Sequence, residues 1–303
     1  MKRYPISVVM ASFNGEKFIQ EQIQSILDQS LLPNEIVICD DNSTDKTVEI
    51  INSMNSPLIK LFVNKESLGV VDNFKKAVSF SNPENMIAFA DQDDIWLPNK
   101  IESLWNELLE INDEQFPALV YSDLSLIDEK GNIVNPSFWN QLSHDQHEHC
   151  LETLLFGNFI TGLSIMMNKK MRANFLMKPD NVILHDVWLA LIAFTFGKVR
   201  RISSPLALYR QHTNNVNYNS TSRKLSKWEM RLLKFKMIFT KNDFLKSEFI
   251  ITKTFYNFYI KELNNDDKVL FNKFMRLEKK PFLLKHIYLR IFFWGKWIKK
   301  PTI

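Results

Sequence analysis

The feature that most constrains the fold is a regular alternation, over the first hundred residues, of short apolar runs with segments of helical periodicity. Short apolar runs bounded by polar clusters are typical of buried strands, whereas apolar residues three and four positions apart indicate an amphipathic helix. Alternating strands and helices imply right-handed crossovers and a mostly parallel sheet covered on both faces. The predicted strands are 6–10, 35–39, 59–63 and 86–90, and the predicted helices are 16–30, 47–54, 73–80 and 99–111.

The second half of the chain has a mixed pattern. Two apolar segments, 118–126 and 132–134, flank Asp128-Glu129-Lys130-Gly131 and predict a hairpin. Further strands are expected at 160–167 and 202–208, and a helix at 182–196. No strand pattern recurs after residue 222. The sequence therefore predicts an α/β domain over 1–220 and a basic, aromatic-rich helical region over 221–303.

The formal net charge of +4 is unevenly distributed along the chain. Residues 1–220 hold 18 Lys and Arg against 27 Asp and Glu, whereas residues 221–303 hold 20 against 7. A basic region favours an anionic partner, either nucleic acid or a membrane surface. Residues 279–303 mix basic and aromatic side chains without an acid, which indicates a membrane-surface helix. The alternative is a solvated helix that packs its Phe and Trp side chains on the domain. No nucleic-acid motif accompanies the charge, so we expect no nucleic-acid partner.

The cysteine content and the hydropathy pattern suggest where the protein resides. Only Cys39 and Cys150 occur, which excludes a disulfide framework and favours a reducing compartment. The N-terminus runs directly into a strand pattern without a cleavable signal. No window approaches the ~20 uninterrupted apolar residues of a membrane span. We therefore expect a soluble cytoplasmic protein, or a peripheral one on the inner face of the cell membrane.

Acidic side chains directly follow the predicted strand 86–90. In α/β sheets the ligand lies outside the carboxyl ends of the strands. Asp91 and Asp93 are two residues apart, so in an extended chain both carboxylates point the same way. Mg²⁺ and Mn²⁺ prefer oxygen ligands and commonly combine one or two carboxylates with substrate phosphates. The segment could therefore bind a divalent ion and a diphosphate, or it could be an acidic turn that caps the helix after Pro98.

A second acidic segment, Asp40–Asp45, follows the predicted strand 35–39. A carboxylate there could accept hydrogen bonds from a base or a ribose. The alternative is an N-terminal cap for the helix 47–54. Both can hold, with Ser43 or Thr44 as the cap and Asp41 as the binding residue.

Three residues of the last third of the α/β domain could also serve a site. Asp186 stands at the start of a predicted helix, where it could act as a general base or simply complement the helix dipole. Arg210 could pair with a diphosphate. His212 could complete a metal site or contact phosphate, although a lone histidine is more often structural.

In combination these motifs resemble glycosyltransferase family 2. The resemblance covers about residues 5–215, and its motifs occur in the family's order. They are Val8–Gly15, Asp40–Asp45, Asn64 with Leu68-Gly69 and Asn73, and Asp91–Pro98.

The resemblance implies a GT-A fold, an inverting sugar transfer and a nucleotide-diphosphate sugar as donor. It assigns Asp186 as the base, with His185 where the family often has Glu. The implied nucleotide-sugar site comprises Ala11, Phe13, Asn14, Asp41, Asn73, Asp91 and Gln92. The implied ligands of Mg²⁺ or Mn²⁺ are Asp93, Asp91 and His212. The implied acceptor-binding residues are Trp96, Thr161, Gly162, His185 and Trp188, of which Trp188 could equally be a core residue.

The forms Asp-Gln-Asp-Asp-Ile-Trp and His-Asp-Val-Trp are similar to the rhamnosyltransferase-like branch that builds bacterial surface polysaccharides such as capsule and cell wall. That branch implies dTDP-L-rhamnose as donor and a glycan or lipid-linked oligosaccharide as acceptor. One alternative is a UDP-sugar donor. Others are a sugar nucleotidyltransferase, whose Gly- and Lys-rich phosphate loop is missing at Ser12–Glu16, and a non-catalytic carbohydrate-binding module.

Overall fold

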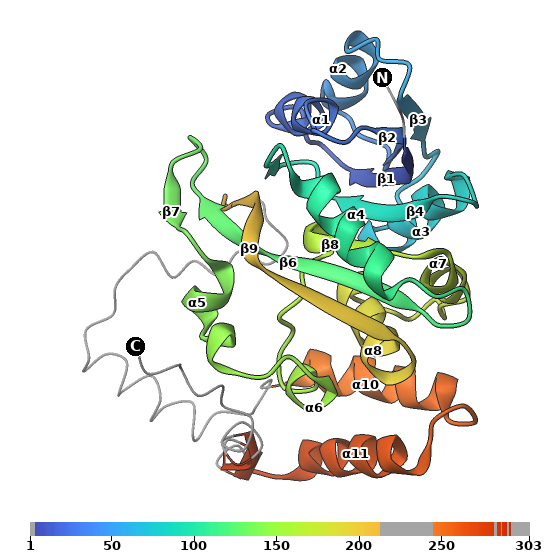
Figure 1. Cartoon of the computed structure of the whole chain (residues 1–303), viewed down its shortest axis with the longest axis vertical. Helices are drawn as coiled ribbons and strands as arrows, with labels where there is room; N and C mark the ends of the chain where they lie inside the picture. The colour runs from blue at the N-terminus through green and yellow to red at the C-terminus, as the bar shows by residue number, and fades with distance from the viewer. Residues whose placement is uncertain (1–3, 213–244, 282–283, 286, 290, 292–303) are drawn as a thin grey trace. The chain divides into compact units, whose positions relative to one another are not determined.

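A computed structural model describes residues 4–212, 245–281, 284–285, 287–289 and 291 (Figure 1). The chain divides into two compact units. The first unit comprises Met1–Leu142 and Phe159–Arg210, and the second comprises Ser143–Asn158 and Gln211–Ile303. The first unit corresponds to most of the predicted α/β domain.

Within the described residues, the strands of the first unit form one nine-stranded sheet in the order β3-β2-β1-β4-β8-β6-β9-β5, with β7 paired to β6. Strands β1 to β4 pair in parallel, as do β6 and β9, whereas β8, β5 and β7 pair antiparallel to their neighbours. This sheet confirms the predicted mostly parallel α/β fold. The strands are β1 (Tyr4–Ser12), β2 (Pro33–Asp40), β3 (Ile59–Val63), β4 (Met86–Ala90), β5 (Ile95–Trp96), β6 (Ala118–Ile127), β7 (Ile133–Asn135), β8 (Ile165–Met167) and β9 (Lys198–Arg210).

Helices cover both faces of the sheet (Figure 1). Because of this cover, consecutive residues of the central strands β2 and β4 are buried on both faces. On one face, α1 (Ile19–Leu27), α2 (Thr47–Ser53) and α4 (Lys100–Ile111) pack their apolar residues onto alternate residues of β1, β2 and β4. On the other face, α3 (Val70–Phe80), α7 (Lys169–Leu176) and α8 (His185–Phe196) lie on the sheet. There Phe89 of β4 contacts Phe74 and Phe175 edge-on, with ring centroids 5.5 and 5.9 Å away.

The segment expected as a strand over 160–167 is only partly one. Residues Gly162–Ser164 form a 3-10 turn, η2, before β8 begins at Ile165. The helix that follows, α7, was not predicted. Its signal was Asn168, whose side chain accepts the Met171 amide at 2.9 Å as an N-terminal cap.

The second unit is helical where the structure describes it. Its elements are η1 (His144–Gln146), α6 (Leu151–Leu154), α10 (Lys246–Tyr259), α11 (Asn265–Met275) and η3 (Arg276–Lys279). Phe156, which follows α6, packs on Phe274 of α11 with ring centroids 5.1 Å apart. This apolar packing places residues 143–158 with the C-terminal helices, which the sequence boundary at residue 220 did not anticipate. The remaining short helix, α5 (Phe138–Leu142), belongs to the first unit.

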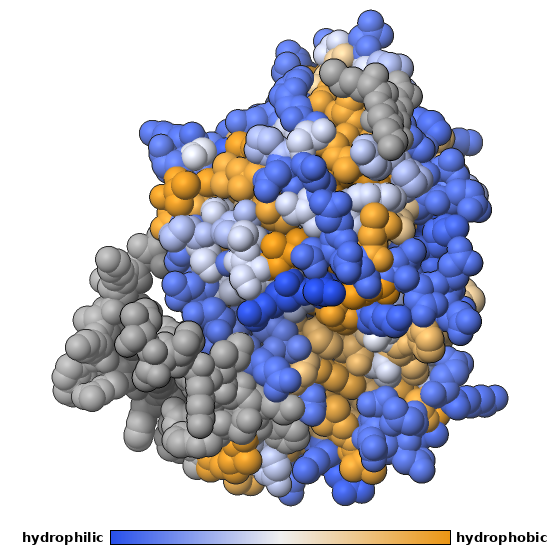
Figure 2. Space-filling model, in the orientation of Figure 1, coloured by the Kyte–Doolittle hydropathy of each residue, from blue (hydrophilic) through white to orange (hydrophobic). Residues whose placement is uncertain are grey.

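The face drawn in Figure 2 carries many hydrophilic residues with apolar ones between them. No helix in the described parts of the chain is both long enough and apolar enough to cross a bilayer. Most of the basic and aromatic segment 279–303 lies outside the described residues. Membrane contact through that segment therefore stays a prediction.

Candidate active site

Four carboxylates lie near one another at the carboxyl end of β4, and we call them the acidic cluster: Asp91, Asp93, Asp94 and Asp186. Asp91, Asp93 and Asp94 follow β4 directly, and Asp186 lies in the first turn of α8. Burial raises the pKa of Asp91 to about 7, with further contributions from the negative charges of Asp93 and Asp186. The structure thus brings the predicted metal-binding acids and the predicted base into mutual electrostatic contact.

The alternative reading of these acids as caps of α4 does not hold. The N-cap position of α4 is Asn99, which makes no side-chain cap hydrogen bond. Instead Gln29 Oε1 accepts the amide of Ile101 at 2.9 Å. The acids are therefore not needed to begin the helix.

Asp94 is the buried member of the acidic cluster. One carboxylate oxygen accepts the backbone amide of Arg210 at 2.8 Å. The other oxygen has no hydrogen-bond partner among the residues that the structure describes. Burial raises the pKa of Asp94 well above its usual value, and the neighbouring carboxylates of Asp93 and Asp91 raise it further.

Lys100 supplies a buried positive charge beside the cluster. Its Nζ donates to the carbonyl of Leu163 and lies 4.1 Å from the centre of the Trp96 ring. Burial lowers the pKa of Lys100 to about 7, although Asp94 and Asp91 act in the opposite direction. A single buried lysine therefore compensates the cluster only in part.

The cluster is chemically suited to Mg²⁺ or Mn²⁺. Its oxygen ligands are those that both ions prefer, and its excess negative charge would be offset by a divalent cation. Within the described residues, no group of three His, Cys, Asp or Glu side chains encloses a metal by itself. Asp91 and Asp93 with substrate phosphates would be the usual arrangement for Mg²⁺.

His212 was predicted as a further metal ligand. It lies two residues beyond the end of β9 and belongs to the second compact unit. Its metal-binding role stays a prediction.

Gln92 lies in the loop between β4 and β5, residues 91–94, which we call the acidic loop. It joins this loop to the loop after β1. Its side-chain amide accepts the Phe13 amide at 2.9 Å and donates to the Phe13 carbonyl at 3.0 Å. Residue 15 must be Gly for this contact, because a Cβ there would overlap Gln92 Oε1. Phe13, which was predicted to line the nucleotide pocket, is thereby held with 51% of its surface exposed. Ala11, predicted for the same pocket, lies on β1 and is half-buried.

Asn14 joins the same loop to the segment after β2. Its Oδ1 accepts the Thr44 amide at 2.9 Å, and its own amide donates to Ser43 Oγ at 2.8 Å. Neither Ser43 nor Thr44 caps α2, contrary to expectation. The Thr47 amide instead donates to Asp45 Oδ1 at 2.9 Å.

Asp41 holds the loop that follows β3. Its carboxylate accepts hydrogen bonds from four donors at 2.7–2.9 Å: Asn64 Nδ2, Ser67 Oγ, Leu68 N and Gly69 N. Burial alone would raise the pKa of Asp41, but these donors together hold it below its usual value. A carboxylate has about four acceptor positions. A base that contacts Asp41, as predicted, must therefore share or displace one of these donors.

Asn73 is also engaged within the protein. It is 1% exposed, donates to the Cys39 carbonyl at 2.7 Å and accepts from Asn64 at 3.0 Å. Its predicted contact with the nucleotide sugar would need a change in these bonds.

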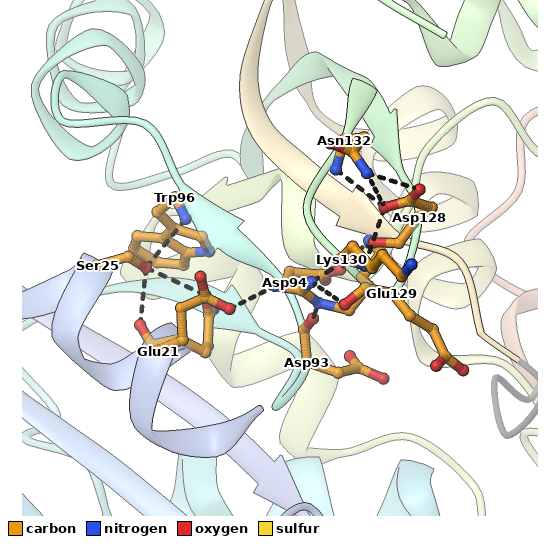
Figure 3. A network of polar contacts seen from close by, with 11 residues as sticks. Glu21, Ser25, Asp93, Asp94, Trp96, Asp128, Glu129, Lys130 and Asn132 are labelled. Atoms are coloured by element: carbon orange, nitrogen blue, oxygen red, sulfur yellow. Dashed lines mark hydrogen bonds and ion pairs between the residues drawn. The ribbon is translucent and has the colours of Figure 1, made fainter. Parts of the chain in front are cut away.

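Arg210 is not available for a diphosphate, contrary to expectation. Its side chain is buried, and its guanidinium donates to Glu21 and to backbone carbonyls. Figure 3 labels residues of the three segments that Arg210 contacts: Glu21 of α1, Asp93 and Asp94 after β4, and Asp128 and Glu129 after β6.

The two tryptophans predicted to bind the acceptor are core residues in this structure. Trp96 is 2% exposed and Trp188 is fully buried. Lys100 lies over the Trp96 ring. Neither indole offers a ring face to a sugar.

The other predicted acceptor residues are grouped at η2 and the start of α8. A Cβ at Gly162 would overlap His185 Nε2, so the two residues are in close contact. In the described structure the Nε2 of His185 and the Oγ1 of Thr161 are buried without a hydrogen-bond partner. Burial lowers the pKa of His185 to about 3, so its imidazole is neutral at pH 7.

The structure adds Tyr209, which the sequence analysis did not select. Tyr209 lies at the end of β9, next to Arg210, and its ring packs edge-on against Phe138 with centroids 6.0 Å apart. Burial, followed by the four charges of the acidic cluster, raises the pKa of its phenol. The hydroxyl therefore stays protonated at neutral pH and can donate a hydrogen bond. The signal that could have found it is its place at the carboxyl end of a strand.

The bonds of Asp41 predict a pH-dependent contribution to stability. Replacement Asp41→Asn should lower the free energy of unfolding by about 2–3 kcal/mol, because hydrogen bonds to a charged acceptor are lost. Since the folded-state pKa is lowered, the contribution is present above the unfolded pKa of about 3.9 and disappears as the pH falls through the folded value. Urea unfolding between pH 7 and pH 2.5 should show the two proteins converging below about pH 4. Ser67→Ala, which removes one donor, should lie between them. A constant difference at all pH values would contradict this role.

Comparisons with known proteins identify the family and agree with the fold. The family model described as "Glycosyl transferase family 2" matches residues 7–161, which include the acidic loop but not Asp186. The dTDP-rhamnosyl transferase RfbG of Shigella flexneri is 30% identical over 220 residues, covering 68% of this chain and 72% of that protein. The UDP-Glc:alpha-D-GlcNAc-diphosphoundecaprenol beta-1,3-glucosyltransferase WfgD of Escherichia coli is 25% identical over 235 residues, covering 76% and 86%.

Among solved structures, the fold is similar to S. aureus TarS 1-349 in complex with UDP-GlcNAc. The TM-score is 0.54 at 15% identity, over 89% of this chain and 79% of that one. This likeness concerns the fold alone. The match of the family model over half of the chain shows that the protein belongs to glycosyl transferase family 2 and is a glycosyltransferase.

Proposed function

We propose that the protein transfers a sugar from a nucleotide-diphosphate donor to a growing bacterial polysaccharide, with inversion at the anomeric carbon. The observation that carries this proposal is the acidic cluster, in which Asp91 and Asp93 of the acidic loop share an electrostatic environment with Asp186 of α8. A single-displacement transfer requires that the general base lie close to the donor site, because the acceptor hydroxyl must attack while the diphosphate leaves. The relatives act in glycan synthesis by their names, which supports a polysaccharide or lipid-linked oligosaccharide as acceptor.

The residues divide the chemistry between them. Asp186 takes the proton of an acceptor hydroxyl, and that oxygen attacks the anomeric carbon from the face opposite the nucleotide. Asp91 and Asp93 would hold Mg²⁺ or Mn²⁺, which when bound neutralises charge on the departing diphosphate. Tyr209 contributes a neutral hydroxyl beside the acidic cluster. This hydroxyl can donate a hydrogen bond to oxygens of a substrate bound there.

The exposed aromatic side chain of Phe13 suits the donor nucleotide, because a base can stack on it. Asn14 and Gln92 keep that loop in place through the bonds described above. Asp41 contributes by ordering the segment 64–69 beside the same edge of the sheet. We propose that the nucleotide binds between these loops.

For the donor we propose dTDP-L-rhamnose, which is supported by the similarity to RfbG at 30% identity. The alternative is a UDP-sugar, which is supported by the similarity to WfgD. The two donors share the diphosphate, so the acidic cluster serves either.

The base assignment predicts the effect of Asp186→Asn. The amide cannot accept the proton, so kcat should fall by roughly 10²–10⁴-fold. Melting temperature and donor binding should stay close to the wild-type values. Release of nucleoside diphosphate in the presence of acceptor measures turnover. Asp180→Asn, an exposed acid six residues earlier, is the matched control and should keep full activity. Full turnover by a folded Asp186→Asn protein would exclude this base.

The donor assignment predicts which ligands stabilise the fold. A ligand that binds only the native state raises the melting temperature by mass action. With Mn²⁺ or Mg²⁺ present, dTDP and dTDP-rhamnose should raise it more than UDP- or GDP-linked species do. A larger shift with UDP-sugars would replace rhamnose with the alternative donor. No shift with any nucleotide sugar would contradict the donor site.

A further inference from the structure

Arg210 borders the acidic cluster and contacts three segments that are far apart in the sequence. It is 2% exposed, and all three guanidinium nitrogens donate to protein atoms. Its charge pairs with Glu21 of α1 at 2.5 Å, and its guanidinium carbon lies 4.5 Å from the centre of the Phe18 ring. A buried charge that is paired and stacked in this way has a fixed position.

Two of its contacts are with the acidic loop itself. Nε donates to the carbonyl of Asp93 at 2.9 Å, and the backbone amide of Arg210 donates to Asp94 Oδ1 at 2.8 Å. These bonds fix the backbone of one predicted metal ligand and the side chain of its neighbour.

The remaining contacts are with the turn between β6 and β7. Nη1 donates to the carbonyl of Glu129 at 3.1 Å and approaches that of Asp128 at 3.5 Å. Arg210 therefore ties the acidic loop to α1 on one side and to this turn on the other, as Figure 3 shows for the labelled partners.

We infer that Arg210 is a positioning residue that sets the geometry of the metal-binding loop and does not itself contact the substrate. The inference rests on the proposed function, because it assumes that Asp93 binds the metal and the donor diphosphate. A guanidinium has donors in a fixed planar arrangement, which an ammonium cannot reproduce. Positions of catalytic groups must be held to within about 0.5 Å, so a loss of this arrangement should weaken metal binding.

Arg210→Lys tests the inference, because it keeps the charge and removes the planar set of donors. Mn²⁺ binding is measured by titration calorimetry in the presence of dTDP or UDP, and Mn²⁺ dependence of turnover is measured in parallel. We expect the Mn²⁺ concentration for half-maximal activity to rise by roughly tenfold or more, and kcat to fall by about 10²-fold, as a misplacement near 1 Å produces. Arg200→Lys is the matched control. Arg200 lies on the same strand, is half-exposed and pairs with Glu107 at 3.4 Å, so its replacement should change neither quantity.

Glu21→Gln is the second variant, in case Arg210→Lys does not fold. It leaves the guanidinium in place and removes its ion-pair partner, so it should weaken Mn²⁺ binding in the same direction by a smaller factor. Wild-type Mn²⁺ affinity in a folded Arg210→Lys protein, even a less stable one, would overturn the positioning role alone. A wild-type protein that binds no Mn²⁺ with either nucleotide would overturn the metal site of the proposed function, and the inference with it.

Discussion

The mutual repulsion of four carboxylates at the end of β4 is the constraint that the surrounding structure must satisfy. Asp94 is buried, and the pKa values of Asp94 and Asp91 are raised by burial and by their neighbours. Like charges held close together and partly buried cost free energy unless cations or hydrogen bonds compensate them. Lys100 provides a buried amine whose charged form Asp94 and Asp91 favour, and Arg210 provides bonds to the loop backbone. What remains uncompensated is the charge that a divalent ion would neutralise.

The polar side chains around the cluster serve mainly to hold loops. Gln92 bonds both backbone groups of Phe13, Asn14 bonds the segment after β2, and Asp41 binds the loop after β3. Four separate loops, which follow β1, β2, β3 and β4, are thus fixed against one another at the carboxyl edge of the parallel strands. This explains why exposed Phe13 can have a defined position although it lies in a turn. Residues that a family motif groups as ligand contacts can therefore act without touching the ligand, by holding in place the loops that form the site.

The parallel core and the acids Asp91 and Asp93 could be predicted because both depend on local patterns, whereas Asp186 was assigned only through the family resemblance. Apolar runs gave the strands, and acids directly after them gave the edge at which the site lies. Long-range partners could not be predicted. The Gln92 contact joins residues 79 positions apart, and the Arg210 pair with Glu21 spans 189 positions. Burial of Trp96, the use of Arg210 and the place of Tyr209 all follow from such pairings. The grouping of residues 143–158 with the C-terminal helices has the same cause, since it depends on packing such as Phe156 on Phe274.

The most direct test of the central claim is to locate a bound metal. Crystals grown with MnCl₂ and dTDP or UDP are measured at a wavelength where manganese scatters anomalously. The account predicts one strong peak about 2–2.3 Å from carboxylate oxygens of Asp93 or Asp91, bridged to the nucleotide phosphates. A nucleotide bound at the loops after β1 and β2 with no manganese at these carboxylates, or manganese bound elsewhere in the first unit, would contradict it.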